Sequence, residues 1–271
     1  MNTRPHTDTG ASSARQRYAR LLEDFDFQLA ANQKQRLEVY HLRHQVYCQE
    51  IGYTPPDGGA GEIEVDPHDR HAVHCLLRHR RTGLAAGCFR LVFPDPTVPE
   101  ASLRLPLQEY GGRSLTHTHL HPSRLPFHEI CEVSRLATAR EFRHHPVRYE
   151  TLSADTPHEH FSDEERRLFP LITGALFLAT HALVELAGRR HIFAMMQPKL
   201  PRLLARSGFH FKLIGMPIEL HGERSAYYID NQVAEAEMQD ALRPFYRCIQ
   251  DALSPQLAGA MPTPGRIAIP S

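Results

Sequence analysis

The sequence predicts an α+β layer fold, in which a mixed and largely antiparallel central sheet is flanked by helices. Apolar stretches over 72–78 and 85–93 read as two strands joined by a turn at 81–83, which is typical of an antiparallel hairpin. An apolar helix over 163–187 is followed by a strand at 191–196. Strands and helices do not alternate regularly along the chain, which argues against a doubly wound parallel sheet.

The remaining elements follow from periodicity and from the residues that begin or end them. Residues 25–29 alternate like a strand, and 32–50 carries an apolar stripe at helical spacing with Asn32 as its cap. Pro170 should kink or divide the helix over 163–187. We also expect short helices at 15–22 and 103–110, a helix at 199–207 closed by Gly208, strands at 129–138, 209–216 and 226–229, and a helix at 232–253.

Shifts in composition divide the chain into four expected parts. These are a partly disordered N-terminal arm over 1–24, a folded domain over 25–231 with an insertion at 139–162, a C-terminal helix over 232–253, and a disordered tail over 254–271. The insertion is polar and contains proline, and the tail is rich in Pro, Gly and Ala, which is typical of segments without a packed core.

Charge and cysteine usage limit the partners and the compartment. Lys plus Arg and Asp plus Glu each number 31, so the formal net charge is zero and nucleic acid, which needs a basic excess, is not expected. The five cysteines form no CxxC pair and the first eleven residues show no secretory signal, which favours the cytoplasm. Residues 168–187 contain Pro170, Gly174, His181 and Glu185, so we expect a buried helix and no integral span, leaving only peripheral membrane contact open.

The strand over 129–136 is unusual because it reads as buried and yet carries Glu132 and Arg135. Buried charges cost free energy unless they are paired or used. Residues three apart on a regular strand face opposite sides, so these two could share one site only if a β-bulge re-aims one of them. Such a bulge would also free backbone N–H groups for a substrate carbonyl oxygen. The alternative is a pair of structural salt bridges, one on each face.

Four further charged residues lie in apolar surroundings earlier in the chain: Arg43, Asp66, Asp69 and Arg90. We expect Asp66 and Asp69 to pair with the two arginines or to bind a cationic amine. The alternatives are an Arg43 that extends from its helix to solvent, an outward-facing Arg90 and solvated acids. The His117-Thr118-His119-Leu120-His121 tract lacks a fitting partner for a metal, so we expect surface histidines and neither metal nor cofactor.

Several short motifs, taken in order, resemble those of a known family. They are Leu42-Arg43-His44-Gln45-Val46-Tyr47, Glu64-Val65-Asp66-Pro67-His68-Asp69, Gly87-Cys88-Phe89-Arg90-Leu91 and Glu132-Val133-Ser134-Arg135-Leu136. This succession resembles the acyl-homoserine-lactone synthase branch of the GNAT acyltransferases. Within that branch the chain is similar to long-chain N-acyl amino acid synthases, in particular the acyltransferases associated with PEP-CTERM/exosortase systems. The resemblance covers about residues 25–228.

The resemblance implies a GNAT-like fold and a set of site residues. It implies catalytic roles for Glu132, Arg135, Arg43 and Arg90, and substrate-binding roles for Asp66, Asp69, Tyr47 and Tyr53. Tyr47 stands where the synthases usually have phenylalanine, and Tyr53 is the candidate replacement for their tryptophan, which this chain lacks. That departure weakens the case for S-adenosylmethionine as the substrate.

The expected function is transfer of a long fatty acyl group from acyl carrier protein (ACP) to the amine of an amino acid, with Glu132 as the base. ACP is preferred to CoA as donor because 139–162, where CoA-using relatives place a glycine-rich phosphate loop, contains no glycine. Two rivals remain, a true acyl-homoserine-lactone synthase and a non-catalytic lipid-binding module on a GNAT scaffold. The expected basic dock for the acidic ACP consists of Arg140, Arg143, Arg148, Arg166 and Arg167.

Overall fold

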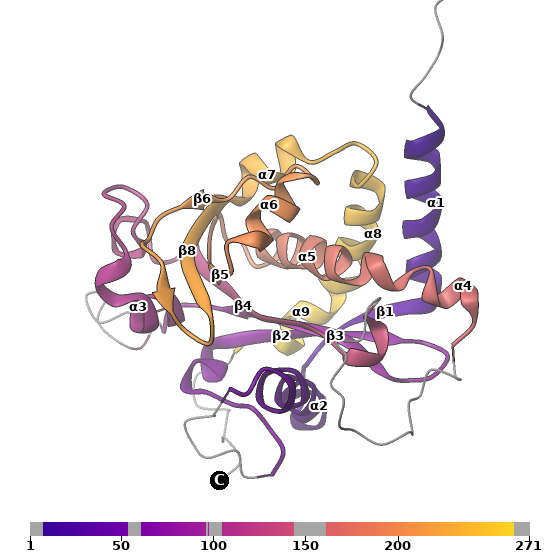
Figure 1. Cartoon of the computed structure of the whole chain (residues 1–271), viewed down its shortest axis with the longest axis horizontal. Helices are drawn as coiled ribbons and strands as arrows, with labels where there is room; N and C mark the ends of the chain where they lie inside the picture. The colour runs from indigo at the N-terminus through magenta and orange to yellow at the C-terminus, as the bar shows by residue number, and fades with distance from the viewer. Residues whose placement is uncertain (1–7, 54–60, 96, 98–104, 144–160, 263–271) are drawn as a thin grey trace, which may run out of the picture.

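The computed structural model describes residues 8–53, 61–95, 97, 105–143 and 161–262. The strands are β1 (Phe25–Leu29), β2 (Ala72–His79), β3 (Ala85–Val92), β4 (Ile130–Thr138), β5 (His191–Met196), β6 (Lys212–Leu213), β7 (Ile218–Glu219) and β8 (Glu223–Asp230). They form one sheet in the order β1-β2-β3-β4-β5-β8-β6, and β7 pairs with β8 (Figure 1). Every pair is antiparallel except β4 with β5. The predicted mixed, largely antiparallel α+β fold is confirmed.

Helices connect and cover these strands. They are α1 (Asp8–Asp24), α2 (Gln33–Arg43), α3 (Pro106–Gly111), α4 (Asp163–Arg166), α5 (Phe169–Leu186), α6 (Lys199–Ala205), α7 (Asn231–Glu237), α8 (Arg243–Leu253) and α9 (Leu257–Ala260). Asn32 caps α2, as expected, by accepting a hydrogen bond from the Gln35 N–H. The predicted division near Pro170 is also confirmed, because α4 ends at Arg166 and Pro170 lies in the first turn of α5.

Two predictions about the C-terminal part are wrong. The helix expected over 232–253 is two helices, because Pro244 occupies the first turn of α8, a position that a continuous helix could not give it without losing a backbone hydrogen bond. Residues 254–260, expected to be disordered, are helical. Gln256 fixes them to the edge strand β1: its side chain accepts from the Leu29 N–H and donates to the Phe27 carbonyl.

The prediction of a strand over 209–216 is also wrong for most of that range. Only Lys212 and Leu213 pair with β8, while Phe209 is buried in the core against the ring of Phe177. The predicted helix at 15–22 belongs to the longer α1. The expectations for 1–7, for 144–160 of the insertion and for 263–271 fall outside the described residues.

Two layers of helices enclose the sheet (Figure 1). Helix α2 packs on one face, over β2, β3 and β4, while α5 crosses β3 and β4 on the other face and is itself covered by α8. Gly87 in β3 permits this close approach, because a Cβ there would lie 2.6 Å from the Leu176 side chain and 2.7 Å from the Ala137 carbonyl oxygen. Among the described helices, α5 alone has the length and hydropathy of a membrane span, and 67% of that stretch is buried inside the fold, as a core helix is.

Candidate active site

Arg43 occupies the last turn of α2 and is completely buried. Its guanidinium donates from Nη1 and Nη2 to the two carboxylate oxygens of Asp69, at 2.7 and 3.1 Å, and from Nε to Glu64 at 2.5 Å. This forked geometry is the arrangement in which arginine binds carboxylates most strongly. The expected pairing of Arg43 with the acidic segment is therefore confirmed, and the alternative of a solvent-reaching arginine is wrong.

Arg90 enters the same cluster from the middle of β3 and has no exposed surface. Its Nη1 donates to Asp66 at 2.6 Å and to Asp69 at 2.7 Å, and its Nε donates to the hydroxyl of Ser134 on β4 at 3.1 Å. Asp69 thus binds both buried arginines, which joins helix α2 to the centre of the sheet.

A short 3-10 helix over Pro67–His71 holds the two aspartates in place. Asp66 caps this helix by accepting from the His68 N–H at 2.9 Å, and Asp69 accepts from the Asp66 N–H at 2.8 Å. The two side chains and the backbone form a capping box, so backbone hydrogen bonds fix the carboxylates in addition to the arginines.

Arg135 lies at the predicted bulge. The β3–β4 register shifts between Cys88 and Arg90, where one extra residue of β4 is accommodated, and Arg135 has a φ of +54°. Its side chain donates to Glu64 through Nε and Nη2 and to Asp66 through Nη2 at 3.1 Å. The bulge therefore brings the guanidinium to the same acids that bind Arg43 and Arg90.

Two tyrosine rings flank Arg135. Its guanidinium carbon lies 5.6 Å from the ring centre of Tyr47 and 5.4 Å from that of Tyr53. Tyr47 belongs to a π-helix over His44–Glu50 and donates its hydroxyl to the Leu136 carbonyl at 2.9 Å, next to the bulge. The side chain of Arg135 is 16% exposed, whereas those of Arg43 and Arg90 are fully buried, so of these three arginines only Arg135 faces solvent.

The acids in this cluster are held in their charged form. Burial alone would raise the pKa of Glu64, but Arg43 and Arg135 outweigh it and lower that pKa. The pKa of Asp69 lies well below its usual value, because Arg43 and Arg90 likewise overcome the effect of burial. The cluster of three arginines and three carboxylates is therefore an internally neutral ion network, which is the condition for burying so many charges.

Glu132 has the opposite electrostatics. Its side chain is buried, 1% exposed, and one carboxylate oxygen accepts from the Leu107 N–H in the first turn of α3 at 2.7 Å. Burial raises its pKa to about 8, against the opposing effects of the Leu107 N–H, Arg90 and Arg135. Two kinds of carboxyl therefore stand in one site, one permanently ionised and one that changes protonation near neutral pH.

The two central parallel strands part at Glu132. They pair only through Ile130–His191, Cys131–Ile192 and Glu132–Phe193, although β4 continues to Thr138 and β5 to Met196. Glu132 is thus the last residue of β4 that pairs with β5. The unpaired stretch of the two strands beyond Glu132 and Phe193 is called the opening between β4 and β5.

Comparisons with known proteins bear on the fold that carries these residues. Residues 42–152 match the family model described as an acetyltransferase (GNAT) domain. Among solved structures, the AHL synthase LasI has a TM-score of 0.54 at 20% identity, covering 81% of this chain and 95% of that chain. BjaI, a CoA-dependent acyl-homoserine lactone synthase solved with MTA, has a TM-score of 0.53 at 17% identity, covering 83% and 89%. FeeM, an N-acyl amino acid synthase from uncultured soil microbes, has a TM-score of 0.51 at 13% identity, covering 81% and 97%. The comparison with curated protein sequences found no match.

Residues 42–152 carry a GNAT acyltransferase domain. The match makes this chain an enzyme that transfers acyl groups. The solved structures confirm the GNAT-like fold implied by its motifs. The identities to the solved structures are 20% or lower, so those structures establish the fold and not the donor or acceptor. None of these findings bears on an association with PEP-CTERM/exosortase systems, which stays a prediction.

The acyltransferase brings together the residues that its motifs single out. All eight predicted site residues lie in or against the ion network: Glu132, Arg135, Arg43, Arg90, Asp66, Asp69, Tyr47 and Tyr53. Their catalytic and substrate-binding roles remain predictions. Because Arg43 and Arg90 have no exposed surface, a role for them in positioning the other residues fits their burial better than direct contact with a substrate.

Two residues of the acyltransferase site were not predicted from the sequence. Glu64 links Arg43 to Arg135 and is fully buried, and Ser134 binds Arg90. The signal for Glu64 was available, because it lies two residues before Asp66 in a segment that must face several arginines. No comparable signal identifies Ser134, because a serine in a strand can face solvent as readily as it can bind a buried arginine.

Other candidates lie apart from this site. Within the described residues no group of three or more His, Cys, Asp or Glu side chains is arranged to hold a metal ion. In the 117–121 tract, His117 accepts from the His119 N–H and His121 bonds to Ser123, so these rings serve local turns. Cys131 is fully buried, which raises the pKa of its thiol and makes it a poor nucleophile.

Proposed function

We propose that this acyltransferase moves a long-chain fatty acyl group from acyl carrier protein to the amine of an amino acid, giving an N-acyl amino acid. The observation that carries the proposal is the environment of Glu132. This buried carboxyl group has a pKa of about 8 and lies near enough to Arg135 for the guanidinium charge to lower that pKa. It also lies at the point where the pairing of β4 with β5 ends. A base of that pKa suits an amine, which must lose a proton before it can attack a thioester.

The reaction then proceeds as a simple aminolysis. Glu132, directly or through a water molecule, takes a proton from the acceptor ammonium, and the amine nitrogen attacks the thioester carbonyl carbon. Backbone N–H groups near the bulge at Arg135 stabilise the oxyanion that develops. The carbon–sulfur bond then breaks, the nitrogen gives up its second proton as the amide forms, and the departing thiolate of the carrier takes up that proton.

The three arginines have separate tasks in this scheme. Arg43 binds Asp69 and Glu64, and Arg90 binds Asp66 and Asp69, so these two arginines order the acidic segment. Arg135 uses Nε and Nη2 for Glu64 and Asp66, while no described residue bonds its Nη1. The Nη1 amino group of this partly exposed arginine is therefore our candidate for binding the acceptor carboxylate.

The opening beyond Glu132 is our candidate for the path of the acyl chain. Helix α5 packs against β3 and β4 with buried apolar residues, among them Leu176 and Leu183, and Phe193 of β5 is also buried. An apolar channel between β4 and β5 would therefore accept a long fatty chain without burying a polar group.

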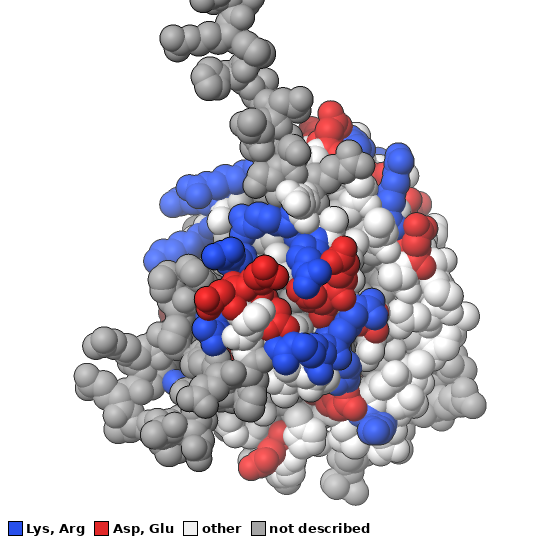
Figure 2. All heavy atoms as spheres, turned by 90° about the vertical axis from the view of Figure 1, so that its right-hand side faces the viewer, with Lys and Arg blue, Asp and Glu red and all other residues white. Residues whose placement is uncertain are grey.

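The case for a basic ACP dock around 140–167 is weakened because two of its arginines pair with acidic side chains. Arg143 donates to Glu50 at 2.5 Å and Arg166 to Asp163, while Arg148 lies outside the described residues. Figure 2, which looks at the side where α1 and α4 lie, shows basic and acidic side chains interleaved there. Such a mixed surface offers no strong field to the acidic ACP.

A second basic segment is a better dock. Between Glu185 and Glu219 the sequence contains no acidic residue. Four exposed basic side chains of this segment form no ion pair with a described acid: Lys199, Arg202, Arg206 and Lys212. The first two belong to α6, which directly follows β5, so a carrier bound there would present its thioester close to the opening between β4 and β5.

A product assay tests the proposal. Purified protein is incubated with long-chain acyl-ACP or acyl-CoA and either mixed amino acids or S-adenosylmethionine, and products are identified by mass spectrometry. We expect N-acyl amino acids from acyl-ACP. Release of methylthioadenosine from S-adenosylmethionine would instead identify an acyl-homoserine-lactone synthase. Acyl-chain binding without any turnover would identify a lipid-binding module and would sink the proposal.

A further inference from the structure

The turn between β7 and β8 brings a residue from far along the chain to the charged site. His221, in that turn, packs edge-on against Tyr53, with ring centres 4.5 Å apart and the ring planes at 70°. The guanidinium carbon of Arg135 also lies near Tyr53, 5.4 Å from its ring centre. Tyr53 is therefore held between the partly exposed arginine of the site and the histidine of the hairpin.

His221 adopts a backbone conformation that favours glycine. Its φ is +50°, although the next residue is Gly222, which has a φ of +93°. The turn is fixed by the Gly222 N–H donating to Glu219 and by Arg224 donating to the Leu220 carbonyl. A positive φ costs free energy in a residue other than glycine, and such residues cluster at functional sites. The positive φ of His221 therefore suggests that its ring has a function.

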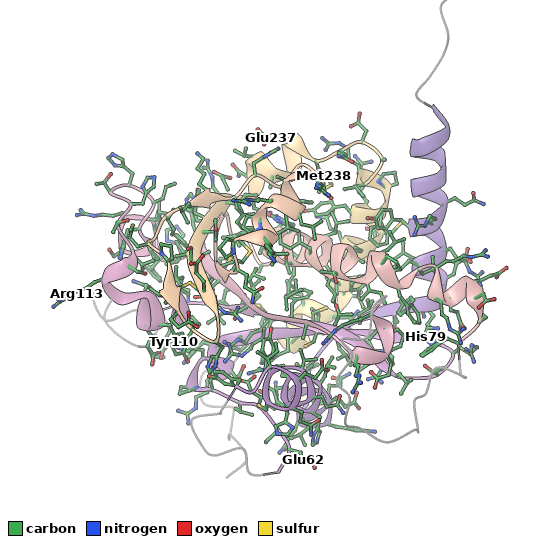
Figure 3. The ribbon with its side chains drawn as sticks, viewed as in Figure 1. Glu62, His79, Tyr110, Arg113, Glu237 and Met238 are labelled. Atoms are coloured by element: carbon green, nitrogen blue, oxygen red, sulfur yellow. The ribbon has the colours of Figure 1, made fainter. Side chains whose placement is uncertain are left out.

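A third ring approaches the same place from α3. Tyr110 is 36% exposed, and burial, with Asp66 and Tyr53 next in effect, raises its pKa to about 12. Figure 3 shows Tyr110 at the end of α3, a helix that contacts β8. Tyr53, Tyr110 and His221 come from three distant segments. Tyr53 contacts both Arg135 and His221, and Tyr110 lies near enough to Asp66 and Tyr53 for both to raise its pKa.

We propose that His221 is a positioning residue that strengthens binding of the acceptor. Its ring holds Tyr53 against Arg135, and this arrangement shapes the wall against which the acceptor amino acid lies. The inference rests on the proposed function, in which Arg135 binds the acceptor carboxylate. It assigns a role in acceptor recognition to the β7–β8 turn, which contributes no residue to the ion network.

Substitutions at His221 can remove the ring without disturbing the backbone. Asn and Gly both tolerate positive φ, so His221→Asn and His221→Gly should leave stability unchanged or raise the melting temperature by ~2–4 °C. We expect both to raise the KM for the acceptor by about three- to tenfold, the range of one aromatic contact, with kcat and the KM for the acyl donor within about twofold. His221→Phe keeps a ring and should restore the acceptor KM.

Glu62 provides the matched control. It also has a positive φ, +57°, and Figure 3 shows it below α2, away from Tyr110. Glu62→Gly should relieve the same backbone strain without changing either KM. If His221→Asn leaves the acceptor KM unchanged, or if it lowers stability and raises the donor and acceptor KM values equally, the inference is overturned. If the wild-type protein makes no N-acyl product, the proposed function itself fails and this inference falls with it.

Discussion

Glu132 and Arg135 lie three residues apart on β4, yet their side chains serve one face of the sheet. Ser134 pairs with Arg90 and shares its face with Glu132, while the bulge turns Arg135 onto that face, where Asp66 binds both Arg90 and Arg135. One extra residue in the strand therefore places an ionisable carboxyl and a partly exposed guanidinium beside the opening between β4 and β5.

The raised pKa of Glu132 makes stability depend on pH. The carboxyl is protonated more readily in the folded protein, at a pKa of about 8, than at its ordinary value of 4.5. Its contribution to the free energy of unfolding is therefore complete below about pH 4.5 and is lost as pH rises to about 8, by at most about 1.4 kcal/mol per pH unit. Urea unfolding of Glu132→Gln should lack this loss, so the variant should gain stability relative to wild type with rising pH. Parallel curves for the two proteins would contradict the raised pKa.

Removing one charge from the ion network should cost far more than removing a surface charge. Asp69→Asn leaves Arg43 and Arg90 buried with too little negative charge, so we expect a loss of about 3–5 kcal/mol in the free energy of unfolding. Asp240, paired with Arg243, is 99% exposed, and Asp240→Asn should change stability by less than about 0.5 kcal/mol. Equal losses in denaturant titrations would show that the network is not desolvated.

Two glycine substitutions test the contact between α5 and the sheet. Gly87→Ala would place a Cβ against Leu176 and a backbone carbonyl, so we expect about 1–3 kcal/mol of destabilisation. Gly174 lies within α5, and a Cβ there would meet only the Tyr18 hydroxyl at 3.6 Å. Gly174→Ala should therefore stabilise by up to about 1 kcal/mol through helix propensity. Thermal unfolding should therefore show a lower melting temperature for Gly87→Ala and a higher one for Gly174→Ala.

Charge reversal discriminates between the two docks for ACP. Lys199→Glu combined with Arg202→Glu should raise the KM for acyl-ACP by about tenfold at low salt, with less effect at high salt. Arg166→Glu, on the mixed-charge surface, should leave that KM nearly unchanged. The control substrate is an acyl thioester without the carrier protein, whose use should be insensitive to all three changes. A stronger effect of Arg166→Glu would restore the dock around 140–167.

Local patterns predicted most of the sheet. The strands over 25–29 and 191–196 and the 72–92 hairpin follow from alternation and turn residues, and the charges of Glu132 and Arg135 required the bulge that the structure contains. Pro244 was an available signal that 232–253 is not one helix.

Contacts between distant segments explain what the sequence could not predict. Residues 254–260 are ordered because Gln256 bonds to β1, more than 200 residues away, and nothing near Gln256 in the sequence indicates that partner. His221 likewise reaches Tyr53 only through the folded hairpin. The burial that raises the pKa of Glu132 depends on α3, whose Leu107 N–H lies 25 residues earlier in the chain.

The pH dependence of kcat/KM with saturating acyl-ACP tests most directly whether Glu132 is the base. We expect wild-type activity to rise through one ionisation near pH 8 beyond that of the acceptor amine itself, and the residual activity of Glu132→Gln to lack that ionisation. A Glu132→Gln enzyme that keeps full activity and the wild-type pH profile would contradict the account.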